Sequence, residues 1–137
     1  MNYHITLTNL YFLFIHADGK VSETEIAMGN QMVKTEGMAP DEFKVQLTLL
    51  RSRDSANVYT ESVAQLKKLD REQQIRCLAW LCVVANADGF MDRTEWQFIY
   101  GLYHRELRLS LDEIMAKQKE LVRIPRNLIS LNLIPVL

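Results

Sequence analysis

Residues 17–26 of the chain read ADGKVSETEI, and residues 87–96 read ADGFMDRTEW. Ala, Asp, Gly, Thr and Glu recur in register, and an apolar residue follows the glycine by two positions in each copy. Each copy comes directly after a long apolar segment. Such a duplication in a chain of 137 residues indicates two related halves. It places four carboxylates at matched positions, which are Asp18, Glu25, Asp88 and Glu95.

Helical periodicity dominates the rest of the chain, which has only five glycines and three prolines. The apolar spacing predicts two core helices, residues 5–16 and 70–86, one before each copy of the repeat. Further helices are predicted over residues 22–36, 40–50, 60–69, 92–107 and 110–122. The sequence therefore predicts an all-α fold: a single helical bundle of about seven helices with an internal two-fold pseudo-repeat, in one domain. Trp80 and Trp96 lie within apolar helical segments and are expected in the core.

The last stretch, residues 124–137, is too apolar to hang free in water. Two interpretations of this C-terminal tail stay open. It fills a groove on its own domain, or it is the element through which the chain binds a protein partner or associates with itself. Alternation of apolar and polar residues over 128–134 makes that segment a weak candidate for a strand.

Charge and cysteine content exclude several classes of protein. The 16 basic and 17 acidic residues give a net charge of -1, and both signs are spread along the chain, so we expect no nucleic-acid partner. Cys77 and Cys82 lie in one apolar helix and are expected as buried thiols rather than a disulfide. The longest fully apolar run, residues 77–85, is far shorter than the roughly 20 residues that span a bilayer, and the N-terminus has no signal-peptide features. We therefore expect a soluble, cytoplasmic protein with no membrane span.

Each copy of the repeat looks like the second half of an EF-hand calcium loop. A hard cation such as Ca²⁺ binds several oxygens at about 2.3–2.6 Å. The glycine permits the left-handed turn around the ion, and Val21 or Met91 anchors the loop in the core. The closing Glu25 or Glu95 falls in the first turn of the next helix, where a carboxylate can bind through both oxygens. The pattern indicates a divalent-cation site, with Ca²⁺ as the preferred ion.

The first half of the calcium loop is missing from both copies. Phe14 and Val84 stand where an EF-hand has its opening Asp, and His16 and Asn86 stand at the next ligand position. Neither copy is therefore an intact EF-hand. If the two half-loops face each other, the four matched carboxylates pool around one shared metal site. Secondary candidates for that site are Asp92, Asn86 and His16.

A purely structural interpretation of the acidic residues is equally available. Ser22 and Glu25, like Asp92 and Glu95, have the spacing of a capping box, in which the Glu accepts a hydrogen bond from the backbone N–H at its own helix start. Each cap contributes about 1 kcal/mol. The two roles are compatible, because one oxygen can cap while the other binds an ion. A capping box does not require the Asp-Gly that precedes it in both copies, and this duplication favours the metal site.

At these residues the sequence resembles the TerB-like family, named for a tellurite-resistance protein. The family signature, Ala-Asp-Gly-x-Val/Ile-x-x-x-Glu after each of two core helices, reads here as residues 17–25 and 87–95, with Met91 in place of the branched aliphatic residue. The resemblance implies an all-helical bundle of about seven helices and a divalent-cation site at Asp18, Glu25, Asp88 and Glu95. It also implies a role in tellurite resistance or another stress response, in a domain that occurs beside partner-binding modules.

No arrangement of residues predicts catalysis. The sequence has no Gly-x-Ser-x-Gly nucleophile motif, Walker loop or dinucleotide fingerprint. Paired carboxylates serve acid–base hydrolysis in some enzymes, but nothing here indicates a substrate site. We therefore expect a non-enzymatic protein, either a cation-binding domain or a protein–protein interaction module whose acidic motifs serve only as helix caps.

Overall fold

The computed structural model describes residues 2–17, 19–88 and 92–133, and among these it describes side chains up to residue 122 except that of Asp88. Within those ranges every regular element is helical, which confirms the all-α prediction. The elements are α1 (Tyr3–Ile15), α2 (Glu23–Glu36), α3 (Pro40–Leu50), α4 (Ser55–Lys68), α5 (Arg71–Ala85), the short η1 (Asn86–Asp88), α6 (Arg93–Tyr100), the π-helical η2 (Gly101–Glu106) and α7 (Leu111–Leu133).

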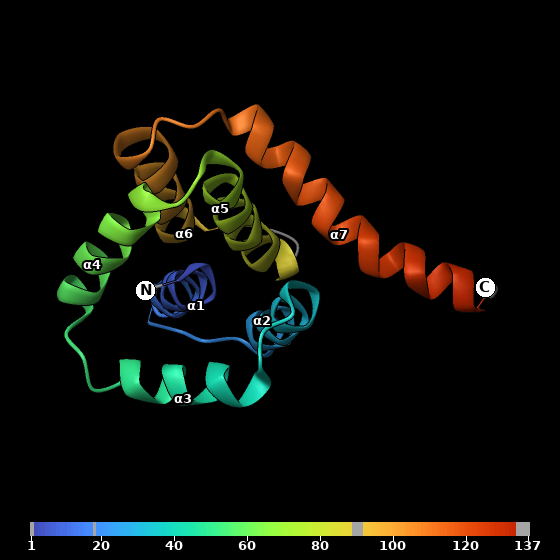
Figure 1. The fold of residues 1–137 in the computed structure, drawn as a ribbon, viewed down its shortest axis with the longest axis horizontal. Coiled ribbons are helices and arrows are strands. Elements are labelled where there is room, and N and C mark those ends of the chain that lie inside the picture. Colours follow the sequence, from blue (N-terminus) through green and yellow to red (C-terminus); the bar gives the residue numbers. More distant parts are fainter. Residues whose placement is uncertain (1, 18, 89–91, 134–137) are drawn as a thin grey trace.

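The two predicted core helices form the centre of the bundle. In Figure 1, α1 runs through the middle of the molecule, with α2, α3, α4 and α5 around it. Residues 6–15 of α1 and residues 77–85 of α5 are buried without interruption. Two buried polar residues of α1 are hydrogen-bonded: the hydroxyls of Thr6 and Thr8 donate to the backbone oxygens of Asn2 and His4 at 2.9 and 2.8 Å. A helix this apolar on all sides must lie inside the fold.

Helix ends follow the sequence signals closely. The side chain of Asp70 accepts from the N–H of Gln73 at 2.8 Å and starts α5. Gly37 ends α2 in the left-handed conformation, with φ of 69°. Cys77 and Cys82 are buried free thiols, as predicted. No helix in the described part of the chain combines the length and apolarity that crossing a bilayer requires.

Four predictions about local structure are wrong. Val21, which was expected to anchor its loop in the core, keeps 42% of its surface exposed. The helix predicted over residues 60–69 begins earlier, at Ser55, because the Asp54 side chain accepts from the N–H of Asn57 at 3.2 Å and starts α4 there. Residues 128–133 are not a strand, since α7 continues as a helix to Leu133. Trp80 is buried, but Trp96 keeps 38% of its surface exposed because it lies on the outer face of α6.

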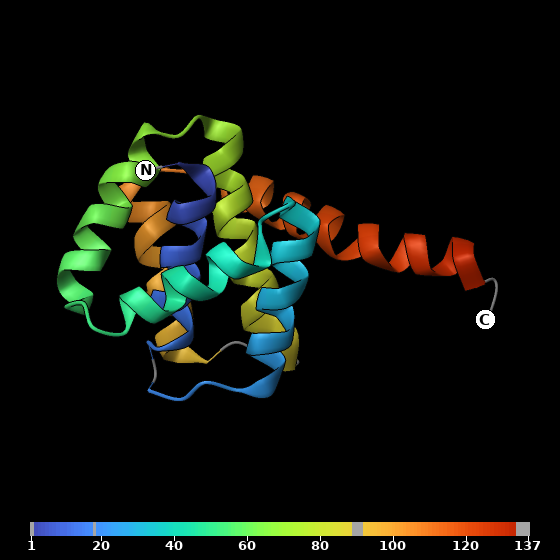
Figure 2. The same cartoon turned by 60° about the horizontal axis from the view of Figure 1, so that its bottom comes forward.

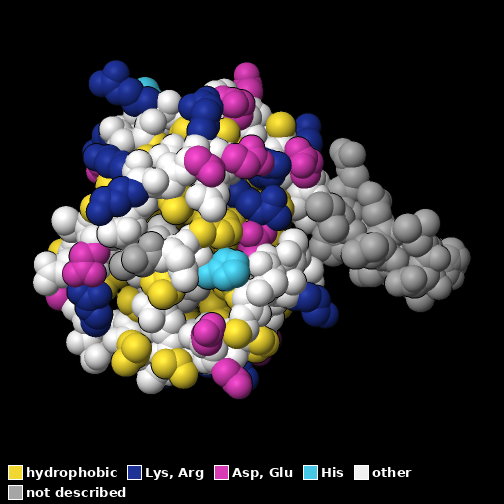
Figure 3. Space-filling model, viewed as in Figure 1, with side chains coloured by type: hydrophobic (Ala, Val, Ile, Leu, Met, Phe, Trp, Pro, Cys, Tyr) yellow, Lys and Arg dark blue, Asp and Glu magenta, His cyan; other side chains and the backbone are white. Residues whose placement is uncertain are grey.

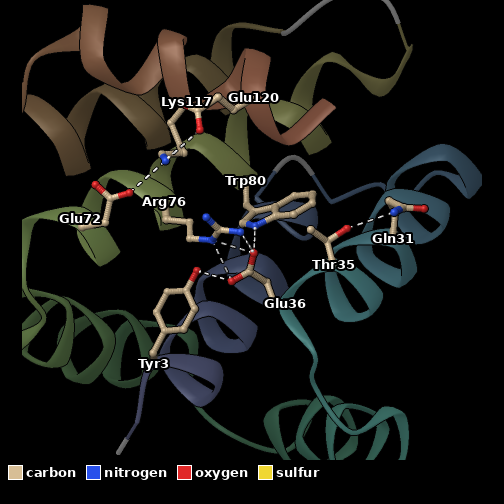
Figure 4. Close-up of polar contacts among 9 residues, drawn as sticks. All are labelled: Tyr3, Gln31, Thr35, Glu36, Glu72, Arg76, Trp80, Lys117 and Glu120. Carbon is tan, nitrogen blue, oxygen red and sulfur yellow. Dashed lines mark hydrogen bonds and ion pairs between the residues drawn. The ribbon is translucent and has the colours of Figure 1, made fainter. Parts of the chain in front are cut away.

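Helix α7 packs on α5 along its first turns and then leaves the body of the molecule (Figures 1 and 2). Ile114 and Leu121 are fully buried in that contact region. Lys117 of α7 lies 2.9 Å from the carboxylate of Glu72 on α5 and 3.2 Å from that of Glu120 (Figure 4). Arg71 and Glu113 form a second ion pair between the two helices. The C-terminal end of α7 projects beyond the body of the molecule and lies apart from α3 (Figures 1 and 2).

Candidate functional site

The two repeated turns lie at the same end of the bundle. Figure 2 shows the ends of α1 and α5 and the starts of α2 and α6 together at the lower edge of the molecule. Helix α2 also packs directly against η1, which follows α5. The duplicated segments, distant in sequence, are therefore neighbours in space.

Both copies form complete capping boxes. In the first, Ser22 Oγ accepts from the N–H of Glu25 at 3.1 Å, and Glu25 Oε1 accepts from the N–H of Ser22 at 2.9 Å. In the second, Asp92 Oδ1 accepts from the N–H of Glu95 at 2.8 Å, and Glu95 Oε1 accepts from the N–H of Asp92 at 3.4 Å. The two capping boxes that the spacing predicts are therefore present.

Glu25 and Glu95 do more than cap their own helices, because their side chains meet. Only 4% of Glu25 and 7% of Glu95 is exposed, and the two carboxyl groups are joined by a hydrogen bond. Burial is the largest of the effects that raise the pKa of Glu95 from 4.5 to about 7, followed by the hydrogen bond to Glu25 and the nearby charges of Asp92 and Glu25. The backbone N–H of Asp92 acts in the opposite direction. A buried carboxyl with a raised pKa beside a second carboxyl is a place where a cation can take the place of the proton.

The other predicted ligands are placed as follows. Asp18 lies outside the described residues, and Asp88 is described only as the last backbone position of η1. Gly19 adopts the left-handed conformation that the repeat predicts, with φ of 78°. The described residues contain no group of three or more His, Cys, Asp or Glu side chains that could hold a metal ion. A site for one ion therefore depends on the two aspartates in addition to the glutamate pair.

The secondary candidates have structural partners. His16 ends α1, where its Nδ1 lies 2.8 Å from the backbone oxygen of Phe12 and its ring packs on the Phe12 ring at 4.3 Å between centroids. The Asn86 amide donates to the backbone oxygen of Cys82 at 2.9 Å. Asp92 caps α6, as described above. These contacts account for all three residues without a metal ion.

Tyr11 fixes the start of α2 beside the glutamate pair. Its hydroxyl donates to the backbone oxygen of Glu25 at 2.9 Å, and burial together with the charge of Glu25 raises its pKa to about 12. Gly29 of α2 makes this contact possible, since a Cβ there would lie 2.2 Å from the Tyr11 hydroxyl oxygen.

We expect Gly29→Ala to destabilise the protein by roughly 1–3 kcal/mol, because Tyr11 must move inside a packed core. In an unhindered helix the same change stabilises by up to about 1 kcal/mol. Urea unfolding measures the effect, and Asn30→Ala, at the next and exposed position of α2, is the matched control. A Gly29→Ala protein at least as stable as the wild type would contradict the close packing of Tyr11 on α2.

A second buried carboxylate, that of Glu36 at the end of α2, was not found from the sequence. Figure 4 shows it facing Tyr3 of α1 and Arg76 and Trp80 of α5. Tyr3 donates to Oε1 at 2.8 Å, Arg76 Nε donates to both oxygens at 3.0 and 2.8 Å, and the Trp80 indole donates to Oε2 at 2.9 Å. The Glu36 side chain is only 4% exposed. One signal was available: an acidic residue in the last turn of a helix opposes the helix dipole and needs a partner elsewhere.

Comparison with known proteins agrees with the repeated motif. The profile of the family described as "Tellurite resistance protein TerB" matches residues 4–118 of the chain. No curated protein matches the chain, and no solved structure matches it.

Proposed function

Because the chain belongs to the tellurite resistance protein TerB family, we propose that it is a non-enzymatic domain of a tellurite or stress response that binds a divalent cation, with Ca²⁺ as the preferred ion. The observation that carries the proposal is the buried pairing of Glu25 with Glu95. A capping box stabilises a helix with its carboxylate at the surface, so capping alone gives no reason to bury two acids against each other.

The donor chemistry fits a hard cation. A backbone N–H is bound to Oε1 of each glutamate, which leaves Oε2 of each for the other carboxyl or for an ion. Ca²⁺ takes six to eight oxygen ligands, more than two glutamates provide. Asp18 and Asp88, which directly precede the two glycines, are the residues we propose to complete the set, together with water.

Tyr11 and the two caps orient the glutamates before an ion arrives. The hydroxyl of Tyr11 holds the backbone of Glu25, and each capping box holds its glutamate against a helix start. Because less conformational freedom is lost on binding, this arrangement favours affinity. The positive ends of the α2 and α6 dipoles remain near the carboxylates and favour their charged form.

We expect Ca²⁺ at a hundredfold excess over its Kd to stabilise the protein by about 2.7 kcal/mol, which corresponds to roughly 10 °C in Tm. Thermal unfolding with Ca²⁺, Mg²⁺ and Zn²⁺ measures the shift. The Asp18→Ala/Asp88→Ala variant should lose most of it.

The matched control is Glu23→Gln/Asp112→Asn, which removes two exposed first-turn carboxylates elsewhere on α2 and α7. This control should keep the full shift. If no metal raises the Tm of the wild type, the cation proposal is wrong and the acidic turns serve as caps.

A further inference from the structure

The outer face of α3 exposes two large apolar side chains and has no covering element among the described residues. Val45 and Leu49 lie on it with 59% and 55% of their surfaces exposed. Beside them is a hollow of about 410 Å³ whose lining includes Ile5, Met38, Phe43 and Val45. We call this surface, with Leu49, the α3 groove. Asp41 and Glu42 also line it, and His4 is the ionisable base among its lining residues. Figure 3 shows apolar and acidic side chains next to each other along α3 at the lower edge of the molecule.

The C-terminal part of α7 has the opposite charge and a matching apolar character. Residues 123–133 read RIPRNLISLNL, with two arginines and no acidic residue. Ile114 and Leu121, seven residues apart, are buried against the body, and Leu128 follows at the same interval. Positions seven apart share a face of an α-helix, so the apolar stripe that packs on the body continues past it. A stripe of this kind in a projecting helix requires a partner.

From these two surfaces we infer that residues 123–133 of one copy occupy the α3 groove of a second copy, and that the exchange is reciprocal. In both ribbon views the end of the helix projects beyond the body of the molecule and lies apart from α3, so its own groove is out of reach (Figures 1 and 2). Each copy carries one helix and one groove, and a two-fold dimer satisfies both at once.

Charge complementarity selects this groove over another hollow of similar size. A hollow of about 430 Å³ between α1, α2 and α3 also has apolar lining, including Phe12 and Ile26. Lys44 and Arg51 line it, and both would repel Arg123 and Arg126. Asp41 and Glu42 of the α3 groove attract the same arginines, and like-charge contacts at an interface are strongly selected against.

Light scattering after gel filtration tests the dimer with two charge-reversed proteins. In the groove variant, Asp41→Lys/Glu42→Lys, the groove becomes cationic. In the helix variant, Arg123→Glu/Arg126→Glu, the helix becomes acidic. We expect the wild type at twice the 15.9 kDa chain mass and each variant alone at the monomer mass. An equimolar mixture of the two variants restores both contacts and should return to the dimer mass, with one copy of each by native mass spectrometry.

The matched control is Glu23→Lys/Asp112→Lys, which makes the same change in charge at first-turn positions outside the groove and should stay dimeric. Thermal unfolding of each protein establishes that it is folded. A monomeric wild type throughout a concentration series overturns the inference, whether the helix then binds its own body or a different protein. Folded variants that stay dimeric alone, or a mixture that stays monomeric, overturn it too.

Discussion

Glu36→Ala should destabilise the protein by about 3–5 kcal/mol. The substitution removes the acceptor for the Tyr3 hydroxyl, the Trp80 indole and the Arg76 guanidinium at once. Because Arg76 is only 28% exposed, its cation would be left partly buried without a counter-charge. Tyr3 belongs to α1 and the other two donors to α5, so three helices lose their common polar contact. Denaturant unfolding measures the loss.

The exposed Arg53–Glu61 pair is the control for this prediction. Its two hydrogen bonds have similar lengths, 2.9 and 2.7 Å, but both side chains are exposed. Exposed pairs contribute little to stability, so we expect Glu61→Ala to cost less than about 1 kcal/mol. Equal losses for Glu36→Ala and Glu61→Ala would show that the buried cluster is not a principal connection between α1, α2 and α5.

The second large effect is a loss of stability as the pH of the metal-free protein rises. The pKa of Glu95 is about 7 in the folded protein and 4.5 as its ordinary value. The folded state binds this proton more tightly than the unfolded state does. The extra stability is therefore fully present below pH 4.5, the pKa of the unfolded state, and is lost as the pH rises from 4.5 through 7. At 1.36 kcal/mol per pKa unit, the loss from this group is about 3 kcal/mol.

Urea unfolding at pH 5 and pH 8 in the presence of a chelator measures this dependence. Glu95→Gln should flatten the curve between these values and raise the stability at pH 8, because glutamine can still accept the capping hydrogen bond without carrying a charge. Glu23→Gln, an exposed carboxylate in the first turn of α2, should leave the wild-type slope unchanged. If stability instead rose between pH 5 and pH 8, burial beside Glu25 would not raise the pKa of Glu95 in the folded protein.

Local signals in the sequence predicted most of the fold. The uninterrupted apolar segments of α1 and α5 are shielded from water only inside a bundle. The caps Ser22 and Asp92 mark where α2 and α6 begin. The start of α4 was missed because its cap, Asp54, precedes a first turn without apolar periodicity. The continuation of α7 past residue 122 was not predicted, because a proline such as Pro125 is unfavourable in the interior of a helix.

The candidate site was predicted in part. The sequence offered a shared site as one alternative, in which the two half-loops face each other, and in the structure Glu25 and Glu95 are in contact. That contact is tertiary, so no spacing along the chain could give its burial or the raised pKa of Glu95. The Glu36 cluster was missed for a similar reason: its donors lie 33 to 44 residues away along the sequence. The ligand roles of Asp18 and Asp88 stay predictions.

We propose that a divalent cation binds between Glu25 and Glu95 once Glu95 has lost its proton. Isothermal titration of Ca²⁺ at pH 8 into the wild type and into Glu25→Gln/Glu95→Gln tests it most directly, because the variant can keep both capping boxes while removing both charges. We expect a saturable isotherm for the wild type and none for the folded variant. An isotherm of equal affinity in both proteins, or no heat in either, would contradict the claim.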